Sequence, residues 1–145
     1  MWFQIRGTGG ERRLHAGPVW DFDIAAGNFG YNIFWDFSPQ GNFARRAVRW
    51  FYHMANTPEI AEKIYIRWQQ IADREVRAMI NLIYSTARTH QAAFERNHER
   101  WRECILHIHH PQPVLQIGTD FMGQVNYLIW WLEERIIWLN GFLYV

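Results

Sequence analysis

The alternation of apolar and polar residues at the start of the chain predicts a short β-hairpin. Residues 2–6 alternate in polarity, which is typical of a β-strand. A glycine-rich turn follows at residues 7–10, and a second strand through Leu14 and Ala16 would complete the hairpin. Pro18 ends the regular pairing, because proline has no backbone N–H to donate. We therefore expect a hairpin over the first sixteen residues.

The next segment, residues 17–43, shows no helical period. It is rich in glycine, asparagine, aspartate and aromatic residues. A loop of this length inside a compact domain is usually functional or disordered. Seven aromatic residues follow Asp21 within the segment, and such a density of large apolar rings argues against disorder. We expect an ordered loop that carries a site.

From residue 44 onward the apolar residues recur at helical spacing, and they predict a body of about four helices. The four expected buried stripes are Phe43, Ala47, Trp50, Phe51 and Met54; Ile60, Ile64, Trp68 and Ile71; Val76, Met79, Ile80, Ile83, Ala87, Phe94 and Trp101; and Val125, Leu128, Ile129, Leu132, Ile136 and Leu139. Together with the hairpin they predict an α+β, mostly helical fold.

Local signals place several helix ends. Thr57-Pro58-Glu59 reads as an N-cap, a proline at the first helical position and an early acid. The prolines of residues 109–113 should end the third helix. The last helix should start near Thr119 or Asp120, and Asn140-Gly141 is a plausible stop.

Composition fits one domain of ordinary size. Apolar residues make up 49% of the 145 residues, and nine of them are tryptophan, so a few helices could share a well-filled core. Cys104 is the single cysteine, so no intrachain disulfide forms, and a buried thiol is its expected state. We expect one partial domain, comprising the hairpin (1–16), the loop (17–43) and the helical body (44–145).

Charge and hydropathy exclude several classes of partner. The formal net charge is +1, which gives no reason to expect binding to nucleic acid or to an anionic membrane. No uninterrupted apolar run reaches the roughly 20 residues needed to span a bilayer. The N-terminal residues also lack the apolar core of a signal peptide. The compartment is left open.

The segment Gly17-Pro18-Val19-Trp20-Asp21-Phe22-Asp23 is the strongest candidate for chemistry. Two carboxylates two residues apart can approach one hard cation, and Mg²⁺ is typically held by one or two carboxylates with water and phosphate oxygens. In protein kinases a short hairpin leads into Asp-Phe-Gly, whose aspartate binds the metal. Taken alone, an Asp-x-Asp pair is more often a solvated turn in which aspartate caps the backbone.

Three other clusters are better explained without a ligand. His107, His109 and His110 are poorly spaced for a transition metal and fit a polar helix end. A second cluster is basic and could hold phosphate, although a solvated helix face is the better interpretation. A third group of aromatics lies in the loop and could pack over the site or against a further lobe. The basic residues are Arg45, Arg46 and Arg49, and the aromatics are Tyr31, Trp35 and Phe37.

The sequence from Gly17 to Asn28, GPVWDFDIAAGN, resembles the signature of the CotH-like (spore coat protein H) atypical protein kinases. Further similar segments cover nearly the whole chain. They are Trp50-Phe51-Tyr52, Thr57-Pro58-Glu59, Arg67-Trp68, Asn97 through Trp101, and Trp131 through Leu139. The resemblance implies a divergent kinase-like fold, of which this chain resembles the C-terminal lobe.

The resemblance also implies site residues and cofactors. Asp21 would bind Mg²⁺ or Mn²⁺ with ATP, Asp23 is a candidate second ligand, and Asn28 is a weaker candidate for shaping the site. The family transfers phosphate from ATP to hydroxyl groups of a protein substrate. A catalytic aspartate and a phosphate-binding lysine are expected upstream, and Lys63 is on the wrong side of the motif. No catalytic residue is therefore assigned within this chain.

Two hypotheses follow. In the first, the chain is the C-terminal part of a CotH-like kinase, active within a longer chain or with a complementing N-terminal lobe. In the second, it is a truncated, non-catalytic remnant or a protein-binding module of that family. Truncation would expose the hairpin edge and the loop aromatics, so self-association of the isolated chain is expected.

Overall fold

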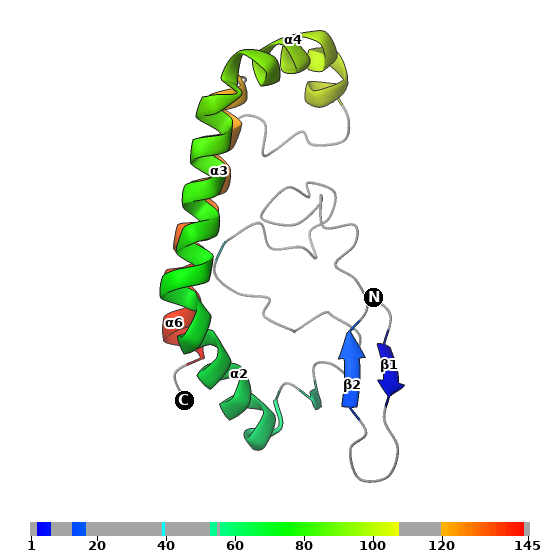
Figure 1. Cartoon of the computed structure of the whole chain (residues 1–145), viewed down its shortest axis with the longest axis vertical. Helices are drawn as coiled ribbons and strands as arrows, with labels where there is room; N and C mark the ends of the chain where they lie inside the picture. The colour runs from blue at the N-terminus through cyan, green and yellow to red at the C-terminus, as the bar shows by residue number, and fades with distance from the viewer. Residues whose placement is uncertain are drawn as a thin grey trace.

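The structure is a computed structural model that describes residues 3–6, 13–16, 39, 53–54, 56–107 and 120–143. Within these ranges the chain is mostly helical, which confirms the coarse prediction of fold class. Figure 1 shows helices α2, α3 and α6 along one side, α4 across the top, and the strands apart from them. The predicted first helix lies almost wholly outside the described residues; the two of its residues that are described, His53 and Met54, are helical.

The two strands are short and antiparallel. Strand β1 (Phe3–Arg6) pairs with strand β2 (Arg13–Ala16), with Phe3 opposite Ala16 and Arg6 opposite Arg13. The first strand thus ends just before the glycine-rich segment, whose residues suit a tight change of direction. Figure 1 shows the pair at the opposite side of the molecule from α3 and α6.

Helix α2 (Pro58–Ile71) begins where the sequence predicted. Thr57 is extended, and its carbonyl oxygen accepts hydrogen bonds from the N–H groups of Ile60 and Ala61. Pro58 occupies the first helical position, where its missing N–H would have no partner in any case. The Thr57 hydroxyl does not cap the helix; it donates to the carbonyl oxygen of His53 at 3.1 Å.

Helix α2 continues without a break through η1 (Ala72–Val76), a π-helical segment, into α3 (Arg77–Thr89). The sequence pattern was interpreted as two separate helices, so this continuity is a correction. Apolar residues recur every four positions here, at Ile64, Trp68, Ala72, Val76 and Ile80. In a regular α-helix each step of four overshoots the turn by roughly 40°. A π-helical turn contains more residues, so η1 removes part of that drift.

The outer face of η1 is charged and exposed. Nε of Arg77 lies 3.5 Å from Oδ1 of Asp73, which is one turn earlier. The guanidinium of Arg74 forms an ion pair with the carboxylate of its neighbour Glu75. Hydrogen bonds from Arg74 hold the pKa of the Glu75 carboxyl below its ordinary value. Exposed pairs of this kind contribute little to stability. The register of η1 is therefore set by its apolar side.

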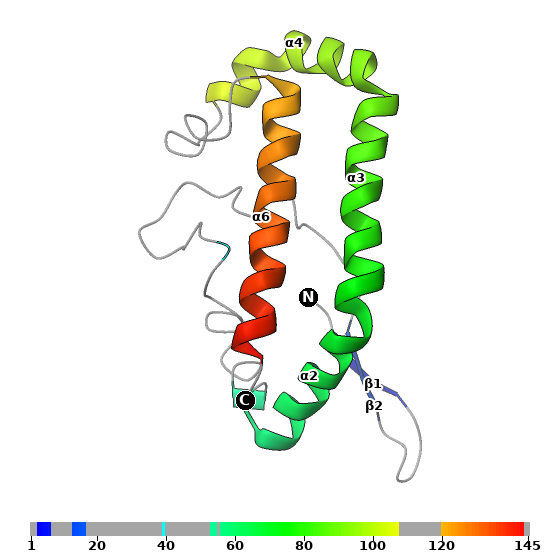
Figure 2. The same ribbon diagram turned by 90° about the vertical axis from the view of Figure 1, so that its left-hand side faces the viewer.

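His90 ends α3, and α4 (Gln91–His107) begins directly after it. The sequence pattern predicted one longer helix through this point, which is wrong. His90 leaves the helical conformation at φ −110° and ψ 18°. Its N–H donates to the carbonyl of Thr86, while its own carbonyl accepts from Ala93 and Phe94. The backbone of His90 thus makes hydrogen bonds both at the end of α3 and at the start of α4. Figure 2 shows α4 crossing the top of the molecule.

Helix α6 (Phe121–Phe142) also begins as predicted, with Asp120 as its N-cap. The Asp120 carboxylate accepts a hydrogen bond from the N–H of Gly123 at 2.6 Å. The predicted stop at Asn140-Gly141 is wrong, because the helix continues to Phe142. A side chain at Gly141 would meet nothing within 4 Å, so packing does not require glycine there.

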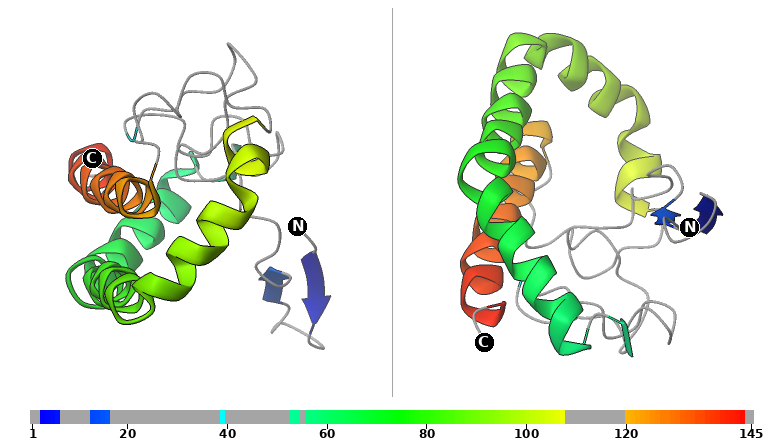
Figure 3. Two further views of the ribbon diagram at one scale, coloured as in Figure 1. Left: turned by 90° about the horizontal axis from the view of Figure 1, so that it is seen from above. Right: turned by 60° about the horizontal axis from the view of Figure 1, so that its bottom comes forward.

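The core lies between α3 and α6, which run antiparallel and side by side (Figures 2 and 3). The predicted stripes on α3 and on α6 both contribute to this core, and the α6 stripe is buried or half-buried throughout. Met79, Phe94 and Trp101 were predicted as core residues but are exposed; the last two follow the change of direction at His90. The buried apolar residues of the described part are Ala72, Ile80, Ala87, Val125, Ile136 and Leu139.

Candidate functional site

The predicted metal-site residues lie outside the described part of the chain. These are Asp21, Asp23 and Asn28, so the metal-site assignment stays a prediction. The loop aromatics, the arginine cluster, and His109 and His110 lie outside it as well. From the segment 17–43, the structure describes Pro39 alone.

Pro39 is buried, and helix α6 holds its backbone. Nη1 of Arg135 donates a hydrogen bond to the carbonyl oxygen of Pro39 at 2.8 Å, across 96 positions of sequence. A buried carbonyl needs a partner, since leaving it unsatisfied costs about 1–3 kcal/mol. The bond therefore fixes one point of the loop segment against the helical body.

Two tryptophans hold the Arg135 guanidinium in place. Its central carbon lies 4.5 Å from the ring centre of Trp138 and 5.7 Å from that of Trp131. A cation over an indole face contributes about 0.5–2 kcal/mol, depending on desolvation. Trp138 stacks in turn on Phe142, with ring centres 4.3 Å apart. We call Trp131, Arg135 and Trp138, with the Pro39 carbonyl, the Arg135 anchor.

A second long-range contact ties the two ends of the helical body together. The indole N–H of Trp68 on α2 donates to the side-chain oxygen of Asn140 on α6 at 2.7 Å. The two residues are 72 positions apart in sequence. This bond links the C-terminal end of α6 to α2.

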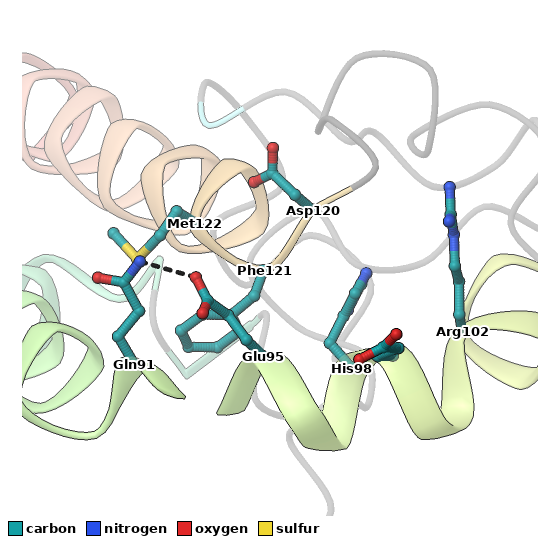
Figure 4. A pocket seen from close by; sticks show the side chains of 8 residues that line it. Gln91, Glu95, His98, Arg102, Asp120, Phe121 and Met122 are labelled. Carbon is teal, nitrogen blue, oxygen red and sulfur yellow. Dashed lines mark hydrogen bonds between the residues drawn. The ribbon is translucent and has the colours of Figure 1, made fainter. Parts of the chain in front are cut away.

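The described residues also form a cavity of about 600 Å³ where α4 meets the first turn of α6. Figure 4 shows side chains of both helices around it, with the hydrogen bond from Gln91 to Glu95 at 2.7 Å. Beside the cavity, Phe94 of α4 stacks on Phe121 of α6 with ring centres 4.9 Å apart, and this contact joins the two helices. The residues that line the cavity are Gln91, Glu95, His98, Glu99, Arg102, Asp120, Phe121 and Met122.

The chemistry of this cavity is mixed. The lining carries three acidic residues, Glu95, Glu99 and Asp120, and one basic residue, Arg102. His98 is the buried polar residue among the lining residues. In the part of the chain that the structure describes, no three His, Cys, Asp or Glu side chains lie together in a way that could hold a metal ion. The cavity therefore matches none of the predicted site residues.

Sequence reasoning missed the Arg135 anchor, although a signal was present. Trp131, Arg135 and Trp138 are spaced at i, i+4 and i+7, so they share one face of a helix. That spacing could have predicted an arginine between two indoles. The carbonyl that it binds could not be predicted, because no local pattern links position 135 to position 39.

None of the described helices is both long and apolar enough to cross a membrane. The chain matches no model of a known protein family, no curated protein and no solved structure.

Proposed function

We propose that this chain supplies the metal-binding segment of a CotH-like phosphotransferase. Asp21 and Asp23 would hold Mg²⁺ or Mn²⁺ together with phosphate oxygens of ATP, and Asn28 would shape the site. The observation that carries the proposal is the sequence Gly17-Pro18-Val19-Trp20-Asp21-Phe22-Asp23, in which both carboxylates follow a segment that pairs as two antiparallel strands.

Two contacts among the described residues support it. Trp68 and Asn140 are bonded, and each lies in or beside a segment that carries the resemblance. The three side chains of the Arg135 anchor belong to the terminal segment, 131–139. Arg135 donates a hydrogen bond to the carbonyl of Pro39, which belongs to the proposed metal-site loop. Each contact thus joins a residue of a segment that carries the resemblance to a residue that lies beside another such segment or within the proposed loop.

The chemistry would be divided between this chain and a further kinase lobe. Phosphoryl transfer depends on positioning and on neutralising charge around the transferred group. Asp21 and Asp23 would hold the metal, which would supply positive charge to the phosphates. The rest of a longer chain, or a complementing N-terminal lobe, would supply the nucleotide-binding surface, the lysine and the catalytic aspartate. The acceptor would be a hydroxyl group of a protein substrate.

The test is calorimetric titration of Mg²⁺ and Mn²⁺, with and without ATP, into the wild-type chain and Asp21→Asn. Asparagine keeps the size of the side chain and removes its charge. Mutating a residue that only hydrogen-bonds to a metal ligand typically weakens metal binding by roughly 10–100-fold. Loss of a direct ligand should weaken metal-dependent ATP binding by at least that factor. Asp73→Asn, which alters an exposed carboxylate on η1, should leave binding unchanged.

Circular dichroism at 222 nm decides whether each variant is folded before its titration is interpreted. A folded wild-type chain that binds neither metal with ATP contradicts the proposal. Equal losses in Asp21→Asn and Asp73→Asn would do so too, because they would point to general charge effects rather than to a site.

A protein-binding module, including one that binds a second copy, is the other candidate. Large apolar side chains are exposed on the described helices, with Leu82 64% and Ile137 65% exposed. Scattered exposed apolar residues are normal, so the number of these residues is what favours the idea. The other exposed residues of this kind are Ile66, Met79, Tyr84, Phe94, Trp101, Trp130 and Phe142.

Under this second candidate the chain should self-associate. The double variant Leu82→Gln/Ile137→Gln should weaken that association by about tenfold or more, because it removes two large apolar side chains from the contact. Light scattering over a wide range of concentration measures the effect. Asn81→Gln, an exposed polar change beside Leu82, is the control. A wild-type chain that stays monomeric throughout excludes self-association.

A further inference from the structure

We infer that Arg135 is a positioning residue that fixes the backbone at Pro39 to helix α6. Through that contact it would fix the position of Pro39 relative to the helical body. The attachment itself stands on the described contacts. Its consequence for metal binding rests on the proposed function.

The geometry favours a fixed contact over a chance surface one. The Arg135 guanidinium lies near two indole rings, at 4.5 and 5.7 Å, and its N–H group points at a carbonyl 2.8 Å away. The side chain is half-buried, and Pro39 is buried. Both partners have therefore lost part of their contact with water, which makes a charged hydrogen bond stronger than at a fully exposed site.

The chemistry also explains why arginine stands at this position. A guanidinium is planar, so it can lie against an aromatic face and still present N–H groups at its edge. A lysine ammonium can sit near one indole, but it lacks the flat face and the fork of donors. Pro39 has no N–H of its own, so its carbonyl is the backbone hydrogen-bonding group available there.

Arg67 on α2 makes a useful contrast. It bonds to Gln70 one turn later at 3.2 Å, both residues are exposed, and the bond joins positions of the same helix. An arginine of that kind can be replaced with little effect on the rest of the chain. Arg67→Met is therefore the matched control for Arg135→Met.

The experiment is hydrogen–deuterium exchange of the full chain, followed by mass spectrometry of peptides within 17–43. In Arg135→Met, amides flanking Pro39 should exchange roughly tenfold faster or more, as expected for loss of a hydrogen bond to a charged group. Peptides of α3 and the N-terminal half of α6 should keep their protection. Arg67→Met should leave exchange around Pro39 unchanged.

Two results overturn the inference. The first is a wild-type chain in which amides around Pro39 exchange as fast as in an unfolded peptide. The second is unchanged exchange there in Arg135→Met while α3 and α6 remain protected. If Arg135→Met unfolds as a whole, Arg135→Gln replaces it, because glutamine stays polar but is shorter and carries no charge for the two indoles. Faster exchange limited to the Pro39 region supports the anchor, and unchanged exchange refutes it.

Titration of Mg²⁺ with ATP into the same variants separates this inference from the proposed function. If the proposed function is right, Arg135→Met should also weaken metal-dependent ATP binding, because its loop is less well positioned. If the wild-type chain binds no metal, the proposed function fails, while the exchange measurement still tests the anchor.

Discussion

Replacing Ile136 by alanine is expected to lower the free energy of unfolding by about 2–4 kcal/mol. Ile136 is 3% exposed and lies in the α6 stripe that packs on α3. Removing its methyl groups loses their transfer free energy and leaves a cavity that the two helices can close only in part. Urea unfolding followed by circular dichroism at 222 nm measures the change.

The neighbouring residue is a matched control. Ile137 has the same side chain but is 65% exposed. Ile137→Ala should change the unfolding free energy by less than about 0.5 kcal/mol. Because both changes have the same effect on helix propensity, their difference isolates burial. Equal losses in the two variants would mean that α6 packs on α3 through a different face.

Ala87→Asp should cost a similar amount, about 2–4 kcal/mol, for another reason. Ala87 is 4% exposed and lies on the face of α3 that packs toward α6. Aspartate there must bury a carboxylate without a partner, and its side chain is too short to reach water easily. The same urea titration measures the loss.

Ala78→Asp places the same residue on an exposed position of the same helix. It should cost less than about 1 kcal/mol, mostly through lower helix propensity. A loss in Ala87→Asp no larger than in Ala78→Asp would show that Ala87 is open to water. A large loss in both would show that α3 tolerates no charge on either side.

The helical part of the fold was largely predictable, because its strongest signals are local. The start of α2 follows from Pro58 at the first helical position, and the start of α6 follows from the capping carboxylate of Asp120. Both signals act within one turn. The α6 stripe followed from spacing alone, since a helix between packed neighbours must bury one side. The kinase-like fold that the resemblance implies remains a prediction.

The errors also have physical causes. The break at His90 was missed because a single non-helical residue leaves the apolar spacing on either side almost intact. The π-helical segment η1 was missed because a period of four is compatible with two helices or with one adjusted helix. Contacts such as Arg135 with Pro39 depend on the whole fold, and the metal-site residues Asp21 and Asp23 stay a prediction.

The order in which the described helices are made during synthesis adds a consequence. Helices α2 and α3 leave the ribosome before α6, and residues 90–142 take roughly 3–10 s to add at ordinary rates of translation. Until α6 arrives, Trp68 lacks its partner Asn140, and the face of α3 around Ile80 and Ala87 lacks the cover that α6 provides. The nascent chain therefore exposes its apolar surface for seconds, which is the interval in which a chaperone would be expected to bind it.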